Sequence, residues 1–139
     1  MVDCLNWRLR NREQALDLCF QGRAITPALL LEIFDWSEER LASANFLGCA
    51  FTKTVNEMSE KLPEVRQIAQ RAKRMLRDRI TALAAECGLC DPEVLGDELT
   101  TVLEGAQVLS LIEHNALPFR CARSVATKLL AFHGCTSAA

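Results

Sequence analysis

The apolar residues of this chain recur at helical spacing in six segments, which are separated by helix-breaking residues. Gly22 and Gly88 are expected stops, because glycine readily adopts the left-handed conformation that ends many helices. Thr26 and Asp91 are expected N-caps, each followed by a proline at the first helical position. The pattern predicts an all-α fold of about six helices. They cover about 5–21, 27–44, 49–60, 63–87, 92–114 and 118–133.

The last two predicted helices are apolar around more of their circumference than contact with a single core requires. The apolar arc of the fifth helix spans about 220° on a helical wheel, whereas about 100° is typical of a helix that lies on one core. We expect the surplus to face a second copy of the chain in a four-helix interface, the alternative being that one helix is central and wrapped by the others. Gly105 lies mid-helix, where it costs about 1 kcal/mol relative to alanine, and a close approach of backbones at this interface would explain it. The residues expected at the homodimer interface are Val102, Gly105, Ala106, Leu109, Ile112, Val125, Leu129 and Phe132.

The composition agrees with a helical domain and excludes several classes of protein. The 139 residues fit a single domain over 1–139, and they include only 6 glycines and 4 prolines. The net charge of -2 argues against a strongly basic nucleic-acid-binding protein. The longest charge-free stretch, residues 41–52, is shorter than the roughly 20 residues of a membrane helix, and the N-terminus has no signal-peptide pattern. The seven dispersed cysteines are then expected to be reduced thiols in a cytoplasmic protein that binds no membrane.

From the second predicted helix onward, four strings resemble the C-terminal regulatory domain of TetR-family transcriptional regulators. Residues 28–43 are similar to the first helices of the family's ligand domain, and GCAF (48–51) resembles the Gly-Cys-x-Phe string that opens the next helix. Residues 63–88 are similar to the long, arginine-rich helix that follows. Residues 91–112 resemble a helix that begins with Asp-Pro and contains an internal glycine. Lys53 departs from the family, which often has asparagine at that position.

This resemblance implies a domain that senses a small molecule and dimerises. Residues 1–25 would be a leading helix, 26–113 would form a pocket for a hydrophobic or amphipathic effector, and 91–133 would include the dimerisation helices. The residues before Thr26 are too few for the family's three-helix DNA-binding head, so we expect no direct nucleic-acid binding by this chain. The side chains expected nearest the pocket lie on inward stripes and include flexible methionines and flat aromatics, although such residues also fill ordinary cores. They are Phe34, Phe51, Val55, Met58, Met75 and Ile80.

Cys87 and Cys90 form a CxxC motif, which by itself is a weak signal. A closed zinc site needs four ligands, and no second pair accompanies this one. Cys87 lies at a predicted helix C-terminus, where the helix dipole raises the pKa of a thiol rather than lowering it. We expect the motif to be a coincidence in a capping turn.

Other polar groups do not form a recognisable catalytic or nucleic-acid-binding arrangement. Arg66, Lys73 and Arg77 line one side of the fourth predicted helix, which we expect to be a solvated face. Glu113 and His114 are adjacent, so their side chains point about 100° apart on a helix and cannot face each other as an acid–base pair. We therefore expect no enzymatic activity, no metal and no cofactor.

Three hypotheses about function follow. The first is the effector-sensing and dimerisation domain of a TetR-like regulator. The second is a helical adaptor without a ligand pocket, whose exposed apolar face docks another protein. The third is thiol-based redox sensing through Cys87 and Cys90.

Overall fold

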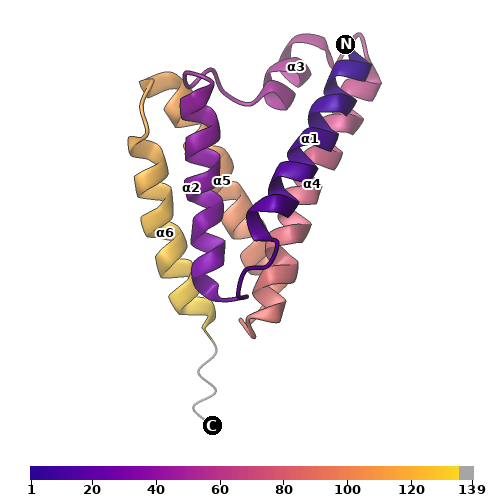
Figure 1. The fold of residues 1–139 in the computed structure, drawn as a ribbon. Coiled ribbons are helices and arrows are strands. Elements are labelled where there is room, and N and C mark those ends of the chain that lie inside the picture. The colour runs from indigo at the N-terminus through magenta and orange to yellow at the C-terminus, as the bar shows by residue number, and fades with distance from the viewer. Residues whose placement is uncertain (135–139) are drawn as a thin grey trace. The chain divides into compact units, whose positions relative to one another are not determined.

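The computed structural model describes residues 1–134, and all six regular elements within them are α-helices, which confirms the predicted fold class (Figure 1). No strand occurs in this part of the chain. The predicted and observed helix boundaries agree to within three residues. The helices are α1 (Val2–Phe20), α2 (Pro27–Ser43), α3 (Ala50–Met58), α4 (Pro63–Glu86), α5 (Pro92–Glu113) and α6 (Leu117–His133).

The glycines between the helices end helices as predicted, but the two predicted N-cap side chains do not form capping hydrogen bonds. Gly22 and Gly88 have positive φ angles of 69° and 72°, as expected for residues that end a helix. Thr26 and Asp91 precede prolines at helix starts, but neither side chain makes a capping hydrogen bond. Asp91 has φ 48° and ψ 56°, a left-handed conformation, whereas a capping side chain needs an extended backbone to reach the first amides.

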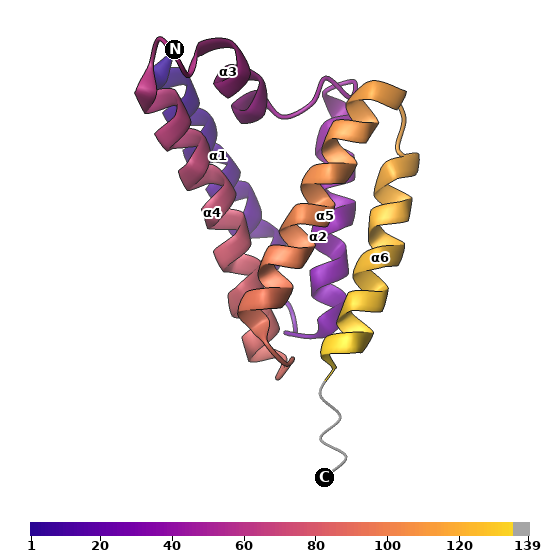
Figure 2. The same ribbon diagram turned by 180° about the vertical axis from the view of Figure 1, so that it is seen from behind.

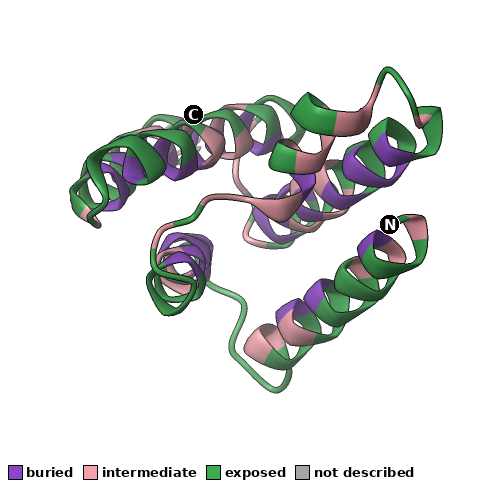
Figure 3. Cartoon of the chain, turned by 90° about the horizontal axis from the view of Figure 1, so that it is seen from above, coloured by how far each residue is buried: buried purple, intermediate pink, exposed green. Residues whose placement is uncertain are grey.

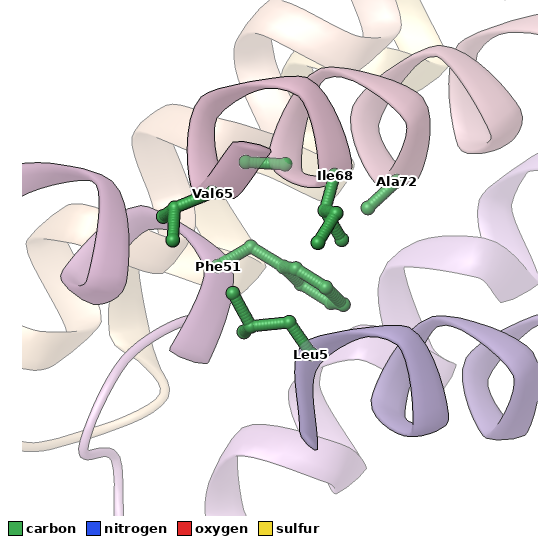
Figure 4. Close-up of a cluster of buried hydrophobic side chains, with 6 residues drawn as sticks. Leu5, Phe51, Val65, Ile68 and Ala72 are labelled. Carbon is green, nitrogen blue, oxygen red and sulfur yellow. The ribbon is translucent and has the colours of Figure 1, made fainter. Parts of the chain in front are cut away.

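The described chain consists of two compact units, and the first contains Met1–Arg23 and Cys49–Leu76. Its elements are α1, α3 and the N-terminal part of α4, and α1 runs beside α4 (Figure 1). In the core of this unit the ring of Phe51 lies between Leu5 of α1 and the side chains of Ile68 and Ala72 of α4 (Figure 4). Among the buried residues of this cluster, Phe51 is the one that comes from the short helix α3.

The second unit contains Ala24–Gly48 and the chain from Arg77 onward, which includes α2, the C-terminal part of α4, α5 and α6. Helix α6 packs against both α5 and α2 (Figure 2). Along each of these helices the buried residues gather on one side (Figure 3). The largest fully buried side chains of this unit include Phe34, Ile80, Leu95, Leu99 and Phe119.

Two ion pairs and one close packing contact join α4 to α5 in the second unit. Arg77 of α4 donates to Asp97 at 2.8 Å and to the Glu93 carboxylate at 2.6 Å, both on α5. Gly96 of α5 lies so close to α4 that a Cβ at this position would collide with the Thr81 hydroxyl. The approach of α4 to α5 therefore requires a residue without a side chain at position 96.

Candidate functional site

An open apolar groove of about 520 Å³ runs between α5 and α6. Its walls come from both helices and are formed mostly by carbon atoms, with polar groups at the end where α5 turns into α6. A groove of this size and character fits an apolar side chain or helix face better than a polar ligand. It is lined by Val102, Gly105, Ala106, Leu109, Glu113, Asn115, Leu117, Pro118, Cys121, Ala122 and Val125.

Local chemistry in the connection between α5 and α6 shapes the polar end of the groove. His114 ends α5 in the left-handed conformation, with φ 54°. The Asn115 carboxamide accepts a hydrogen bond from the Leu117 backbone amide at 2.9 Å and donates to the Glu113 carbonyl at 3.2 Å. These two bonds satisfy backbone groups of the tight turn that joins α5 to α6.

The groove and its rim bring together most residues predicted for a homodimer interface. Five of the eight line the groove, and their neighbours Ile112 on α5 and Phe132 on α6 are 69% and 84% exposed. Leu109 is also half exposed. Ala106 is buried, so it supports the floor of the surface rather than its outer layer. We call Val102, Gly105, Leu109, Ile112, Val125, Leu129 and Phe132 the α5–α6 surface.

The wide apolar arcs of α5 and α6 are therefore not both buried within the described chain. One side of α5 is enclosed by residues such as Leu95, Leu99 and Leu103, while Leu109 and Ile112 remain exposed. The alternative, a central helix wrapped on all sides, is wrong for α5. Large apolar side chains exposed together on adjacent helices are typical of an interaction surface.

The six residues predicted to line an effector pocket are apolar contributors to the two cores. Phe51 is buried, and Val55 and Met58 pack against its cluster in the first unit. Phe34 and Ile80 are fully buried in the second unit, and Met75 is half-buried in the first. None of the six lines the α5–α6 groove. Their contact with an effector stays a prediction.

The CxxC motif does not form an internal disulfide, because Cys87 is a free thiol. Cys90, however, is disulfide-bonded, so the expectation that all seven cysteines are reduced thiols is wrong. Burial and the neighbouring Glu86 carboxylate raise the pKa of Cys87. The predicted direction of the pKa is thus confirmed, and its physical causes are desolvation and a like charge. No cluster of three or more possible metal ligands occurs among residues 1–134.

His133 at the end of α6 is buried and bonded through both ring nitrogens. Nδ1 lies 2.8 Å from the Cys90 carbonyl oxygen, and Nε2 lies 2.9 Å from a carboxylate oxygen of Glu98 on α5. Burial lowers the pKa of His133, but these hydrogen bonds and the charges of Glu98 and Asp91 outweigh burial and raise the pKa. Since both neighbours are acceptors, the protonated ring, which donates from both nitrogens, fits this position best.

Three basic side chains of α4 have intramolecular partners. Arg66 donates to the Ser59 hydroxyl at 3.1 Å, and Lys73 Nζ donates to Cys49 Sγ at 3.4 Å. Arg77 is occupied by its carboxylates on α5.

Cys49, immediately before α3, lies in a cationic environment that sequence reasoning missed. Burial raises the pKa of its thiol, but Lys73, Arg12 and hydrogen bonding by Thr52 together outweigh burial and lower the pKa to about 7. Arg12 of α1 is buried, and its Cζ lies 5.6 Å from the centre of the Phe51 ring. The thiol precedes α3 and the two cations come from α4 and α1, so no local sequence motif could have revealed this arrangement.

Comparisons with known proteins give no relative from which a role could be transferred. No family model matches the chain, and neither a curated protein nor a solved structure does. Within the described residues, no helix has the length and apolar character needed to cross a membrane. The function must therefore be argued from the site itself.

Proposed function

We propose that this chain is a helical regulatory module that dimerises through the α5–α6 surface and senses a hydrophobic or amphipathic small molecule. The observation that supports the dimerisation part is the exposure of Leu109, Ile112 and Phe132 beside an apolar groove. The sensing part rests on the resemblance of residues 28–112 to the regulatory domain of TetR-type regulators.

A second copy of the chain is the occupant that fits this surface most simply. The groove between α5 and α6 is open and lined in part by the exposed side chains of Leu109 and Val125, so a two-fold axis can place the exposed apolar side chains of one copy against the groove of the other. Four helices then pack around a shared apolar core. Gly105 lies in the groove wall with open space where a Cβ would be, which leaves room for a close backbone approach.

Matched charge substitutions test the dimer. Ile112→Glu places a charge in the α5–α6 surface, and symmetry places it there twice. Leu18→Glu, on α1, introduces the same group at a side chain that is 72% exposed but belongs to the first unit. We expect light scattering after size-exclusion chromatography to show a dimer for the unchanged chain and for Leu18→Glu, and a monomer for Ile112→Glu. A dimer that persists in Ile112→Glu would refute this interface.

The sensing part has a separate test. A ligand at 100 times its dissociation constant stabilises the protein by about 2.7 kcal/mol, which a thermal-shift screen with hydrophobic compounds detects readily. A stabilising compound that still binds the Ile112→Glu monomer supports an effector site inside the fold. Absence of any shift across a broad set of compounds would favour the second candidate, a helical adaptor that uses its apolar face for another protein.

A further inference from the structure

Within the first unit, a thiol and two cations from different helices surround one point at the start of α3. Cys49 precedes α3, Lys73 comes from α4, and Arg12 comes from α1. The distance from Lys73 Nζ to Cys49 Sγ is 3.4 Å, within hydrogen-bonding range for sulfur. The start of a helix adds the partial positive charge of its unpaired amides. All of these groups stabilise a negative charge on the sulfur.

Arg12 provides the independent sign that an anion belongs at this point. Its residue is 7% exposed, and its Nε is buried without a hydrogen-bond acceptor among the described residues. The guanidinium lies over the Phe51 ring, whose π face attracts a cation but accepts only weakly. A buried guanidinium is costly unless a negative group compensates it. The Cys49 thiolate, or an oxygen atom bound to its sulfur, can supply that charge.

We propose that Cys49 is a nucleophilic thiol site that reacts with hydroperoxides, with Lys73 and Arg12 as the cations that hold the reacting groups. The thiolate sulfur attacks the terminal oxygen of the hydroperoxide. An S–O bond forms and the O–O bond breaks, so that the sulfur loses two electrons and the peroxide gains them. The leaving alkoxide, or hydroxide from hydrogen peroxide, takes a proton from the Lys73 ammonium or from water. The product is a sulfenic acid on Cys49 and an alcohol or water.

The surroundings of Cys49 distinguish it from the other thiols of the chain, so the reaction is expected at this cysteine rather than at all of them. Cys4, Cys87 and Cys121 are also free thiols, so they serve as internal controls in the same chain. Cys87 is the sharpest of them, because it is also half-buried but its neighbour is the Glu86 carboxylate instead of two cations. The electrostatic surroundings of Cys49 and Cys87 are thus opposite.

The size of the effect follows from two opposing factors. With a pKa of about 7 instead of 9.0, Cys49 is half thiolate at pH 7, roughly 50-fold more than an ordinary thiol. The less basic thiolate is also a weaker nucleophile, by about tenfold for two pKa units. The net advantage at pH 7 is therefore about fivefold, and it disappears near pH 8 and reverses above it, as ordinary thiols ionise as well.

The pH dependence of labelling separates this advantage from simple accessibility. The unchanged chain is treated with dilute hydrogen peroxide and dimedone between pH 5.5 and 9.5, and the rate at each cysteine is measured by peptide mass spectrometry. We expect the rate at Cys49 to reach half its plateau at a pH of about 7, and the rate at Cys87 to keep rising through pH 9. Equal pH profiles at the two cysteines, or no sulfenic acid at Cys49, would overturn the proposal.

A pair of lysine variants tests the role of the cation. Lys73→Gln removes the charge next to the sulfur, while Lys53→Gln removes an exposed charge from α3 itself. We expect Lys73→Gln to move the midpoint of the Cys49 profile upward and Lys53→Gln to leave it unchanged. An unchanged midpoint in Lys73→Gln would contradict the proposed charge partner. Because the main readout is the unchanged chain, the proposal does not depend on whether either variant folds, and it is independent of self-association.

Discussion

Replacing glycine by alanine is expected to have opposite effects on stability at two positions of α5, Gly96 and Gly105. Both lie in the interior of the helix, where replacing glycine by alanine removes a flexible residue and stabilises the helix by about 1 kcal/mol. A Cβ at position 105 meets no atom within 4 Å. A Cβ at position 96 collides with the Thr81 hydroxyl and lies 3.4 Å from the Arg77 carbonyl oxygen, which is backbone and cannot move easily.

The magnitudes follow from these surroundings. Gly105→Ala keeps the full helix gain, so we expect the free energy of unfolding to rise by about 1 kcal/mol. Gly96→Ala has the same gain, but overpacking costs typically about 1–3 kcal/mol. Since the helix contribution is common to both variants, their difference of about 1–3 kcal/mol isolates the α4–α5 contact.

The assay is urea unfolding followed by circular dichroism, carried out in the Ile112→Glu background so that self-association does not contribute. A difference of 1 kcal/mol corresponds to roughly 4 °C in the melting temperature of a chain of this length, which gives an independent check. If Gly105→Ala destabilises the monomer as much as Gly96→Ala, the reasoning from open space at position 105 is refuted.

The same substitution is expected to act in the opposite direction on the dimer. If backbones approach closely at Gly105, two added methyl groups face the two-fold axis, and an overpacking cost of about 1–3 kcal/mol raises the dissociation constant by about fivefold to more than a hundredfold. A more stable monomer with a weaker dimer is a combination that a purely structural role of Gly105 does not produce. Unchanged dissociation in Gly105→Ala would place the glycine outside the contact.

Three further predictions test separate parts of the fold. The pKa of His133 is raised in the folded chain, so the protonated ring stabilises the fold. This stabilisation is fully present below the pKa of about 6.5 of an unfolded histidine and is lost as the pH rises through the folded-state pKa. Unfolding in urea should therefore become easier from about pH 5.5 to 8.5 in the unchanged chain and much less so in His133→Gln, and equal pH slopes would contradict this. Phe51→Ala should lower the free energy of unfolding by about 3–5 kcal/mol, whereas Phe132→Ala, at an exposed position with one edge contact to His133, should lower that of the monomer by less than about 1.5 kcal/mol; similar losses would mean that the burial of the two rings is misjudged. Arg123→Ala removes a half-exposed ion pair to Asp35 at 3.1 Å and should cost less than about 1 kcal/mol, and a larger loss in thermal unfolding would show that this pair is more than a surface contact.

The helices and the exposed apolar surface could be predicted from the sequence because both follow from local patterns. Prolines at positions 27, 63 and 92 and the spacing of apolar residues define the helices within a few residues. The excess apolar arc of α5 indicated that some of it stays exposed, and the exposure of Ile112 confirms this. Such inferences need no knowledge of which helices are neighbours.

The polar sites could not be predicted, because their members are far apart in the sequence. Lys73 lies 24 positions after Cys49, and His133 lies 35 positions after Glu98. Only the packing of helices brings these groups within hydrogen-bonding distance. The local CxxC motif pointed to Cys87, whose surroundings raise the pKa of the thiol, while the cationic surroundings belong to Cys49.

The mass of the unchanged chain in solution shows whether the chain self-associates as proposed. Sedimentation equilibrium over protein concentrations from about 1 to 100 μM distinguishes a chain of 15.5 kDa from a dimer of twice that mass. We expect the dimer to predominate at the upper end of this range, since the exposed side chains of α5 and α6 are then removed from water. A mass of 15.5 kDa at every concentration would contradict self-association through the α5–α6 surface and would leave a different protein as its partner.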